Sequence, residues 1–212
     1  MPPPRVVTES SNACSTVCGV RQQLSFFSVD ARAPTVADLA GLLCASGQTV
    51  RFGRGGAARL SMVVDEQWRV AALAAECALR GVIAELAASQ DGRPLLRTAF
   101  RADLAELAAA WTRGAVKAVP ACFEAHGPIL RLWAQAAGRR DGRGYLLALD
   151  PHAPDTHEPI AAALARAGLA AVPLGPRAGG PALRITGRRR LGRLAELVGA
   201  PPATAAPDAW PA

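Results

Sequence analysis

Arginines supply most of the side chains in this sequence that could act on a ligand, and many of them flank glycine-containing turns. On and around the two predicted hairpin turns and strands they are Arg51, Arg54, Arg59, Arg139, Arg140, Arg143 and Arg184. Apolar residues alternate with polar ones beside the first turn, which predicts that Arg51, Arg54 and Arg59 share the open face of a hairpin. Guanidinium groups there would contact phosphates or guanine edges. Ordinary solvent-facing strands would show the same pattern, so that alternative stays open.

A second basic cluster, Arg188, Arg189 and Arg190, begins the helix expected over residues 188–198. Cations are mildly unfavourable at a helix N-terminus. The cluster therefore indicates an external anion, although an arginine-rich composition explains it nearly as well.

The sequence gives little support for a metal site or a phosphate-binding loop. Cys14 and Cys18 have no second Cys/His pair at zinc spacing. The histidines His152 and His157 lie beside Asp155 in a proline-containing stretch, where a loop and a helix N-cap account for them. The first glycine-rich turn lacks the Lys-Ser/Thr of a phosphate-binding loop. We expect no bound metal and no cofactor.

Composition narrows the class of protein. The 212 residues are 50% hydrophobic, which suits one large domain or two small ones sharing a core. The net charge of +7 favours a polyanionic partner such as nucleic acid, although Lys117 is the one lysine and the arginine excess is partly compositional. No segment approaches the roughly 20 apolar residues of a membrane helix, and no secretory signal or disulfide framework is evident. We expect a cytoplasmic protein with no membrane partner.

The elements that must position these residues form a weak internal repeat. We interpret residues 1–33 as a flexible leader containing a short strand at 24–29, and residues 201–212 as a Pro/Ala tail with no packing pattern. Residues 34–112 and 113–200 are each predicted as helix, hairpin, helix, hairpin and helix, an α/β (α+β) fold. In the second half we expect a helix at 115–126, strands at 129–134 and 144–149, a helix at 155–166, strands at 169–174 and 182–186, and a helix at 188–198.

The run Leu39-Ala40-Gly41-Leu42-Leu43-Cys44-Ala45-Ser46-Gly47 resembles the LAGLIDADG signature of homing endonucleases. That resemblance implies two repeats packed on two central helices, with small residues such as Ala40 and Gly41 against the partner helix. It also implies that the hairpin sheets form a saddle over DNA. An acidic residue near the end of each central helix would there hold a metal that activates water.

The acidic positions are replaced in this sequence. Ser46 stands at the first, and we place the second central helix at residues 119–127, with Ala121 and Cys122 for packing and His126 at the terminal position. Neither Ser46 nor neutral His126 supplies the anionic oxygen that Mg²⁺ prefers. The sequence therefore predicts a protein that is not an enzyme.

A closer resemblance, over about residues 35–199, is to the N-terminal part of WhiA-type regulators of bacterial sporulation and cell division. The run Cys122-Phe123-Glu124-Ala125-His126-Gly127-Pro128-Ile129 looks like their second central helix, and Tyr145-Leu146-Leu147-Ala148-Leu149 with the elements after it is similar to the next part of those proteins. The resemblance implies a DNA-associated role in transcription regulation. Those regulators continue into a helix-turn-helix domain, and no candidate recognition helix comes after Gly199 in this sequence.

Three functions are consistent with these observations. The first is a catalytically inactive, double-stranded-DNA-associated protein linked to transcription in sporulation or cell division. The second is a protein-interaction module that partners a full-length regulator. The third, which the replaced acids disfavour, is a residual metal-dependent endonuclease.

Overall fold

The computed structural model describes residues 28–206 and 208–211. The rest of the predicted leader, with most of the strand expected at 24–29 and with Cys14 and Cys18, lies outside the described residues. Val29–Ala31 forms a short 3-10 turn, η1, and the Ser28 hydroxyl donates to the backbone carbonyl of Glu196 at 3.1 Å. The described start of the chain therefore packs on the last helix.

The first half has the predicted order of elements. It consists of η2 (Val36–Leu39), α1 (Ala40–Cys44), β1 (Gln48–Phe52), β2 (Ala57–Val63), α2 (Gln67–Leu79), β3 (Ala84–Ala88), β4 (Pro94–Thr98), η3 (Ala102–Leu104) and α3 (Ala105–Ala110). The side chain of Asp38 accepts from the backbone N–H of Thr35 at 2.8 Å, which stabilises the start of the first central helix.

The second half begins after a short connecting hairpin, β5 (Thr112–Arg113) and β6 (Val116–Lys117). Its elements are α4 (Gly127–Ala137), β7 (Gly138–Asp141), β8 (Gly144–Ala148), η4 (Pro154–Thr156), α5 (His157–Arg166), β9 (Val172–Leu174), η5 (Pro176–Ala178), β10 (Ala182–Thr186) and α6 (Arg188–Val198). None of the helices among the described residues combines the length and the apolar character that crossing a membrane requires.

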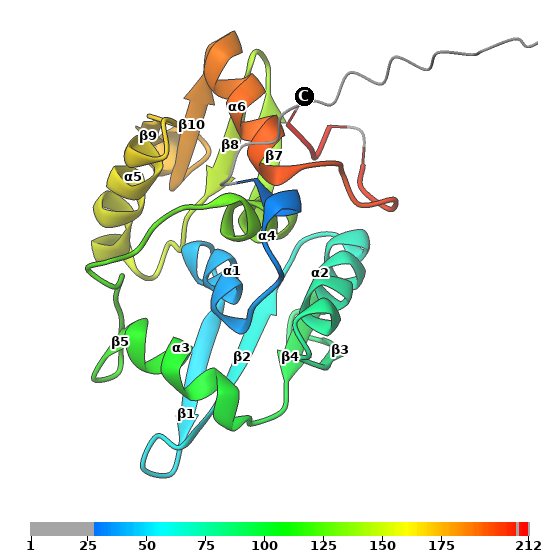
Figure 1. Cartoon of the computed structure of the whole chain (residues 1–212), viewed down its shortest axis with the longest axis vertical. Helices are drawn as coiled ribbons and strands as arrows, with labels where there is room; N and C mark the ends of the chain where they lie inside the picture. Colours follow the sequence, from blue (N-terminus) through cyan, green and yellow to red (C-terminus); the bar gives the residue numbers. More distant parts are fainter. Residues whose placement is uncertain (1–27, 207, 212) are drawn as a thin grey trace, which may run out of the picture.

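The two four-stranded antiparallel sheets have matching strand orders, β1-β2-β4-β3 and β7-β8-β10-β9. The helices lie on one side of both sheets, with α1 and α4 at the centre of the molecule (Figure 1). Alternate strand residues such as Leu60, Met62, Leu147 and Leu183 are buried against these helices. The opposite face of each sheet, here called its open face, carries no helix.

The central helices pack closely because α1 supplies a glycine at the contact. Leu39, Ala40 and Gly41 are all buried. A β-carbon at Gly41 would overlap the carbonyl oxygen of Ile129 and lie 2.8 Å from Cβ of Leu132, both on α4. Glycine therefore sets the approach of the two helices.

The position predicted for the second central helix was wrong. Residues 115–126 form no helix and contain the short strand β6, and the central helix is α4, where strand 129–134 was expected. Ala121 and Cys122 are exposed and do not pack between central helices. His126 is the N-cap of α4, so it lies at the start of that helix and not at its end. The physical reason is the Gly127-Pro128 pair, since proline in the first turn begins a helix as readily as glycine ends one.

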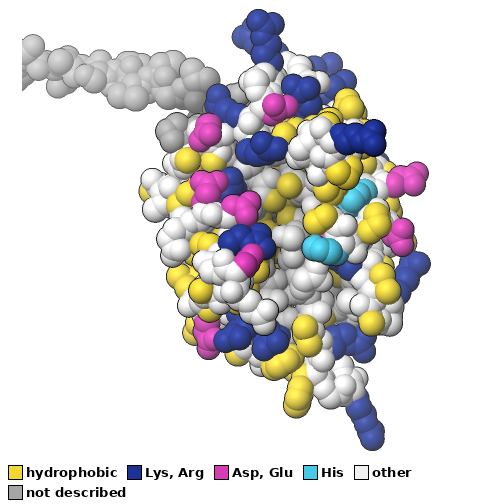
Figure 2. All heavy atoms as spheres, turned by 180° about the vertical axis from the view of Figure 1, so that it is seen from behind, with side chains coloured by type: hydrophobic (Ala, Val, Ile, Leu, Met, Phe, Trp, Pro, Cys, Tyr) yellow, Lys and Arg dark blue, Asp and Glu magenta, His cyan; other side chains and the backbone are white. Residues whose placement is uncertain are grey.

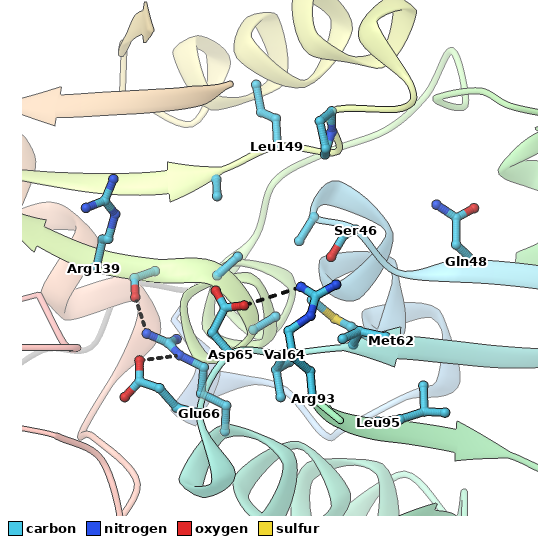
Figure 3. Close-up of a pocket in the computed structure, with 18 of the residues that line it drawn as sticks. Ser46, Gln48, Met62, Val64, Asp65, Glu66, Arg93, Leu95, Arg139 and Leu149 are labelled. Atoms are coloured by element: carbon cyan, nitrogen blue, oxygen red, sulfur yellow. Dashed lines mark hydrogen bonds and ion pairs between the residues drawn. The ribbon is translucent and has the colours of Figure 1, made fainter. Parts of the chain in front are cut away.

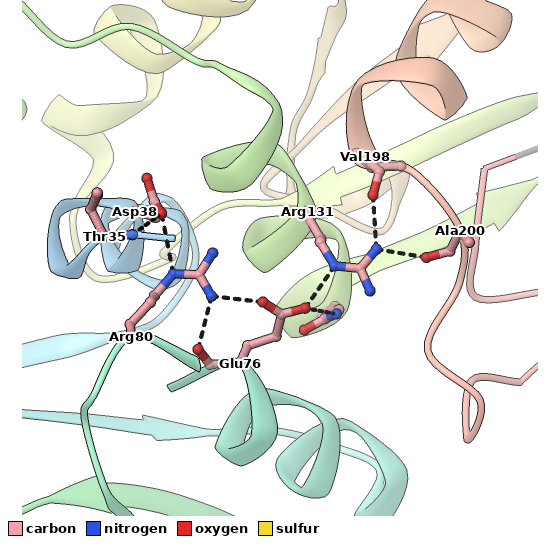
Figure 4. Close-up of polar contacts among 8 residues, drawn as sticks. Thr35, Asp38, Glu76, Arg80, Arg131, Val198 and Ala200 are labelled. Atoms are coloured by element: carbon pink, nitrogen blue, oxygen red, sulfur yellow. Dashed lines mark hydrogen bonds and ion pairs between the residues drawn. The ribbon is translucent and has the colours of Figure 1, made fainter. Parts of the chain in front are cut away.

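Buried charges connect the two halves through α2 and α4 (Figure 4). Arg80 pairs with Asp38 at 3.3 Å and with Glu76 at 2.7 Å. Glu76 in turn pairs with Arg131 of α4 at 2.6 Å, and Arg131 donates to the backbone carbonyls of Val198 and Ala200. These contacts satisfy charges that would be costly to bury alone.

The C-terminal residues are packed, contrary to the expected tail without a packing pattern. Ala209 and Trp210 are buried. The Arg140 N–H donates to the Asp208 carbonyl at 3.0 Å, and the Tyr145 hydroxyl donates to the Ala209 carbonyl at 2.8 Å. The segment 208–211 therefore covers the edge of β7.

Candidate nucleic-acid interface

A cavity of about 620 Å³ lies where the C-terminal ends of the two central helices meet the sheets. Ser46 lies beside it at the end of α1, and Ala136 and Ala137 line it from the end of α4. Asp65 and Arg93 form an ion pair in it at 3.5 Å, and Arg139 reaches it from the second sheet (Figure 3). The two halves therefore contribute to one site.

Strand register identifies the equivalent positions of the two halves. In the first sheet, Gln48 of β1, Ser61 of β2 and Arg97 of β4 form one row across the strands. In the second sheet, the corresponding row consists of Arg139 of β7, Leu146 of β8 and Arg184 of β10. When the two rows are matched, Gly47 corresponds to Gly138, because each glycine immediately precedes the first residue of its row. The residue that corresponds to Ser46 is thus Ala137, and not His126 as the sequence suggested.

A buried lysine closes the end of α1. The Lys117 ammonium donates to the carbonyls of Ala45 at 2.6 Å and Gly47 at 3.0 Å, and it pairs with Asp150 at 2.9 Å. Gln48 donates to the same carboxylate at 2.7 Å. Burial lowers the pKa of Lys117, and Asp150 opposes that shift. Burial would raise the pKa of Asp150, but hydrogen bonds from Lys117 and from the His152 N–H outweigh it and hold that pKa below its usual value.

A buried arginine closes the end of α4. The Arg69 guanidinium, which comes from α2 of the first half, donates to the carbonyls of Gln135 and Gly138, each at 2.8 Å. It also pairs with the carboxylate of Glu66 at 3.1 Å. A hydrogen bond from the Trp68 indole is the main cause that lowers the pKa of Glu66. Each central helix therefore ends against a cation, which its negative dipole end favours.

The residues at this place do not fit the divalent metal that the LAGLIDADG resemblance implies. Ser46 and Ala137 offer no anionic oxygen, and Lys117 and Arg69 already hold the helix-end carbonyls. Within residues 28–206 and 208–211, no group of three His, Cys, Asp or Glu side chains could hold a metal ion.

The open faces carry four arginines. Arg59 and Arg97 lie on the first sheet and Arg139 and Arg184 on the second, as their pairing with Val50, Ser61 and Leu146 requires. Arg54 and Arg143 lie exposed in the β1–β2 and β7–β8 turns. Basic side chains are spread along this side of the molecule, with acidic groups between them (Figure 2).

Arg51, predicted for the open face of the first hairpin, and Arg140, predicted in the turn at residues 138–142, both lie on the helix side of their strands. Arg51 is opposite the buried Ala58, so it projects to the helix side of the first sheet. Arg140 is opposite the buried Tyr145, and its guanidinium donates to the carbonyl of Trp210 at 2.9 Å. The prediction assumed that Val50 and Phe52 face the core, whereas both project from the open face. Because successive residues of a strand point to opposite faces, Arg51 lies on the helix side.

The basic cluster on α6 is also separate from the open faces. Arg188, Arg189 and Arg190 are exposed in the first turn of α6, which packs on α4 and β10. They line a hollow with Arg193 on the helix side of the molecule.

Sequence reasoning missed Arg97, Arg69, Lys117 and Asp150. Arg97 alternates with the buried Leu96 and Thr98, and that alternation was the available signal. Lys117 was recognisable only as the single lysine within an apolar stretch. Nothing in the sequence pairs it with Asp150, which lies 33 residues away.

Comparison with known proteins supports the fold and little else. No protein-family model matches the chain, and no curated protein does. The solved structure of the homing endonuclease I-WcaI bound to its DNA recognition sequence is similar, with a TM-score of 0.54 at 10% identity over 85% of this chain and 90% of that one. The chain thus has a homing-endonuclease-like fold.

Proposed function

We propose that this chain binds double-stranded DNA on the open faces of its two sheets and does not cut it. The observation that carries the proposal is the pair of buried cations, Lys117 and Arg69, which hold the helix ends where the resemblance implies acids. A divalent cation would meet positive charge at these helix ends, where the carboxylates of Asp150 and Glu66 are already paired with the two cations. The DNA-bound neighbour of the same fold supports the choice of ligand.

The biological role is proposed from the sequence resemblance to WhiA-type regulators, which suggests transcription regulation in sporulation or cell division inside the cytoplasm. Immunoprecipitation of the tagged protein from sporulating and dividing cells, with sequencing of the bound DNA, tests it. Enrichment at promoters supports a regulatory role, and a protein-only complex with a full-length regulator would replace it with the interaction-module alternative.

The DNA contact is tested by fluorescence anisotropy with a random 30-base-pair duplex, a length of about 100 Å at 3.4 Å per step. We expect affinity that falls steeply with salt, because phosphate contacts release counterions. Replacing Arg59 and Arg139 by Gln should reduce affinity about tenfold or more and lower the salt slope by roughly two. The matched variant, Arg188→Gln with Arg189→Gln, loses the same charge from the helix side and should have the smaller effect.

Cleavage is tested with supercoiled plasmid and Mg²⁺ or Mn²⁺. Intact plasmid under conditions that saturate binding supports the proposal. Metal-dependent nicking that survives purification of a second, independently prepared sample contradicts it and restores the endonuclease alternative.

A further inference from the structure

An apolar patch made of Val50, Phe52 and Phe100 lies on the open face of the first sheet. The exposed fractions of these residues are 46%, 64% and 41%, respectively. The rings of Phe52 and Phe100 are 5.3 Å apart at an interplanar angle of 46°, so they form one continuous surface. Hydrophobic and basic side chains lie together toward the end of the molecule that carries the β1–β2 turn (Figure 2). An exposed apolar patch with a polar rim is typical of a contact surface.

The fold itself does not require this patch. In the matched register, the position of Val50 corresponds to Asp141, and the position of Arg59 corresponds to Gly144. The second half thus forms the same sheet with a charged residue where the first half exposes valine. The exposed valine is therefore a feature of the first half alone.

Arg59 gives the patch an anion-binding neighbour. Its guanidinium lies 4.9 Å from the centre of the Phe100 ring, and its Nε is buried without a hydrogen-bond partner. Arg97 and Arg184, by contrast, pair with Glu85 at 3.3 Å and with Asp141 at 2.9 Å. Among the described residues, no acidic side chain forms an ion pair with Arg59, so its charge is available to a phosphate.

We propose that this patch contacts the C5-methyl groups of thymine while Arg59 contacts a neighbouring phosphate. This inference rests on the DNA binding proposed above. The thymine methyl is the apolar group that a base pair presents in the major groove, and phenylalanine is among the side chains that contact it. Phosphate alone would not account for exposed phenylalanines. The first half of the protein therefore selects A·T base pairs, and the second half does not use this contact.

The experiment compares two duplexes that differ only in those methyl groups. The first is an alternating A·T duplex of 20 base pairs, roughly two helical turns in length. The second is the same duplex with deoxyuridine in place of thymidine, and the affinity for both is measured by anisotropy at fixed salt. We expect the deoxyuridine duplex to bind about fourfold more weakly for each contacted methyl group, the factor expected for one buried apolar carbon. Phe52→Ala and Phe100→Ala should each reduce this ratio toward one.

Leu86→Ala is the matched control, because Leu86 is also an exposed apolar residue but pairs with the buried Leu96 and so lies on the helix side. It should leave the ratio unchanged. Before binding is measured, each variant must have the same midpoint of urea denaturation as the wild type.

The outcomes separate this inference from the proposed function. Equal affinity for both duplexes, or a ratio that Phe52→Ala leaves intact, overturns the thymine contact while salt-dependent binding keeps the DNA-binding proposal. Failure of both duplexes to bind at low salt overturns both proposals, and leaves the patch to a protein partner.

Discussion

The two central helices end against the same cavity, but the two halves of the molecule neutralise these ends differently. Below α1, Lys117 and Asp150 form a buried pair whose side chains are 8% and 1% exposed. Below α4, Arg69 is 7% exposed but its carboxylate partner, Glu66, is 46% exposed. One cation therefore depends on a desolvated acid, and the other on an acid in contact with water.

Two unrelated arrangements of side chains place a cation at the two helix ends. This difference shows that the requirement for a cation comes from the helix ends themselves. The carbonyls of a helix C-terminus need donors, and they attract positive charge. Lysine from the connecting hairpin and arginine from α2 each supply both. The carboxylates then balance the cations, and the degree of burial decides how much stability each one contributes.

Removing the buried acid should have the largest effect. Asp150→Asn leaves the Lys117 ammonium buried without a countercharge, and we expect a loss of about 3–5 kcal/mol in the free energy of unfolding. Urea denaturation monitored by circular dichroism measures it. The control, Glu66→Gln, removes a partly exposed partner and should cost under about 1 kcal/mol. Equal losses in the two variants would abolish the distinction between the halves.

Acid titration should sharpen the same comparison. The pKa of Asp150 in the folded protein lies below its ordinary value of 3.8, so the unfolded state binds the proton first as the pH falls. The stabilisation is therefore complete above about pH 5 and is lost through the folded pKa. Urea midpoints of the wild type should fall over that range, and those of Asp150→Asn should fall less. Parallel curves would show that other carboxylates control the acid transition.

Arg69→Met should have an intermediate effect. It removes the donors to the carbonyls of Gln135 and Gly138, which remain in a buried region, at a cost of about 1–3 kcal/mol. Methionine retains most of the apolar volume, so packing is largely conserved. Hydrogen exchange should report faster exchange in the last turn of α4 than in α1. Uniform acceleration in both helices would mean that Arg69 supports the whole core.

The surface pairs on the open faces should matter least for stability. Arg97–Glu85 and Arg184–Asp141 are both substantially exposed, so Glu85→Gln and Asp141→Asn should each change the unfolding free energy by under about 1 kcal/mol. Both variants remove negative charge beside an arginine and should tighten DNA binding at low salt. Weaker binding would show that the carboxylates orient these arginines for the contact.

The fold was predictable where local signals agreed. Leu39 to Gly47 marked the first central helix because the close contact at Gly41 requires a small residue, and the strands of the first half were predicted from their alternation. The second central helix was misplaced because Gly127 is equally compatible with a stop or a start. The helical spacing of Ile129, Leu130 and Trp133 was the signal that could have settled it.

The candidate site was less predictable, because it is assembled from contacts distant in sequence. The arginines of the open faces were partly found, since alternation along a strand is local information. Arg51 was assigned to the wrong side because the choice of the buried face depends on the helices above, and Arg140 was placed in a turn although it lies in β7. The buried cations could not be found, because Lys117 and Arg69 have meaning only beside helices from other parts of the chain.

The crossed capping of the central helices also bears on how the molecule can be divided. Arg69 of the first half completes α4 of the second, and Asp150 of the second half balances the lysine that completes α1 of the first. A half produced alone would therefore carry an open helix end or an unbalanced ammonium group. The two sheets repeat one architecture, yet each half supplies a charged group that the other needs, so we expect halves produced separately to fold only when both are present together.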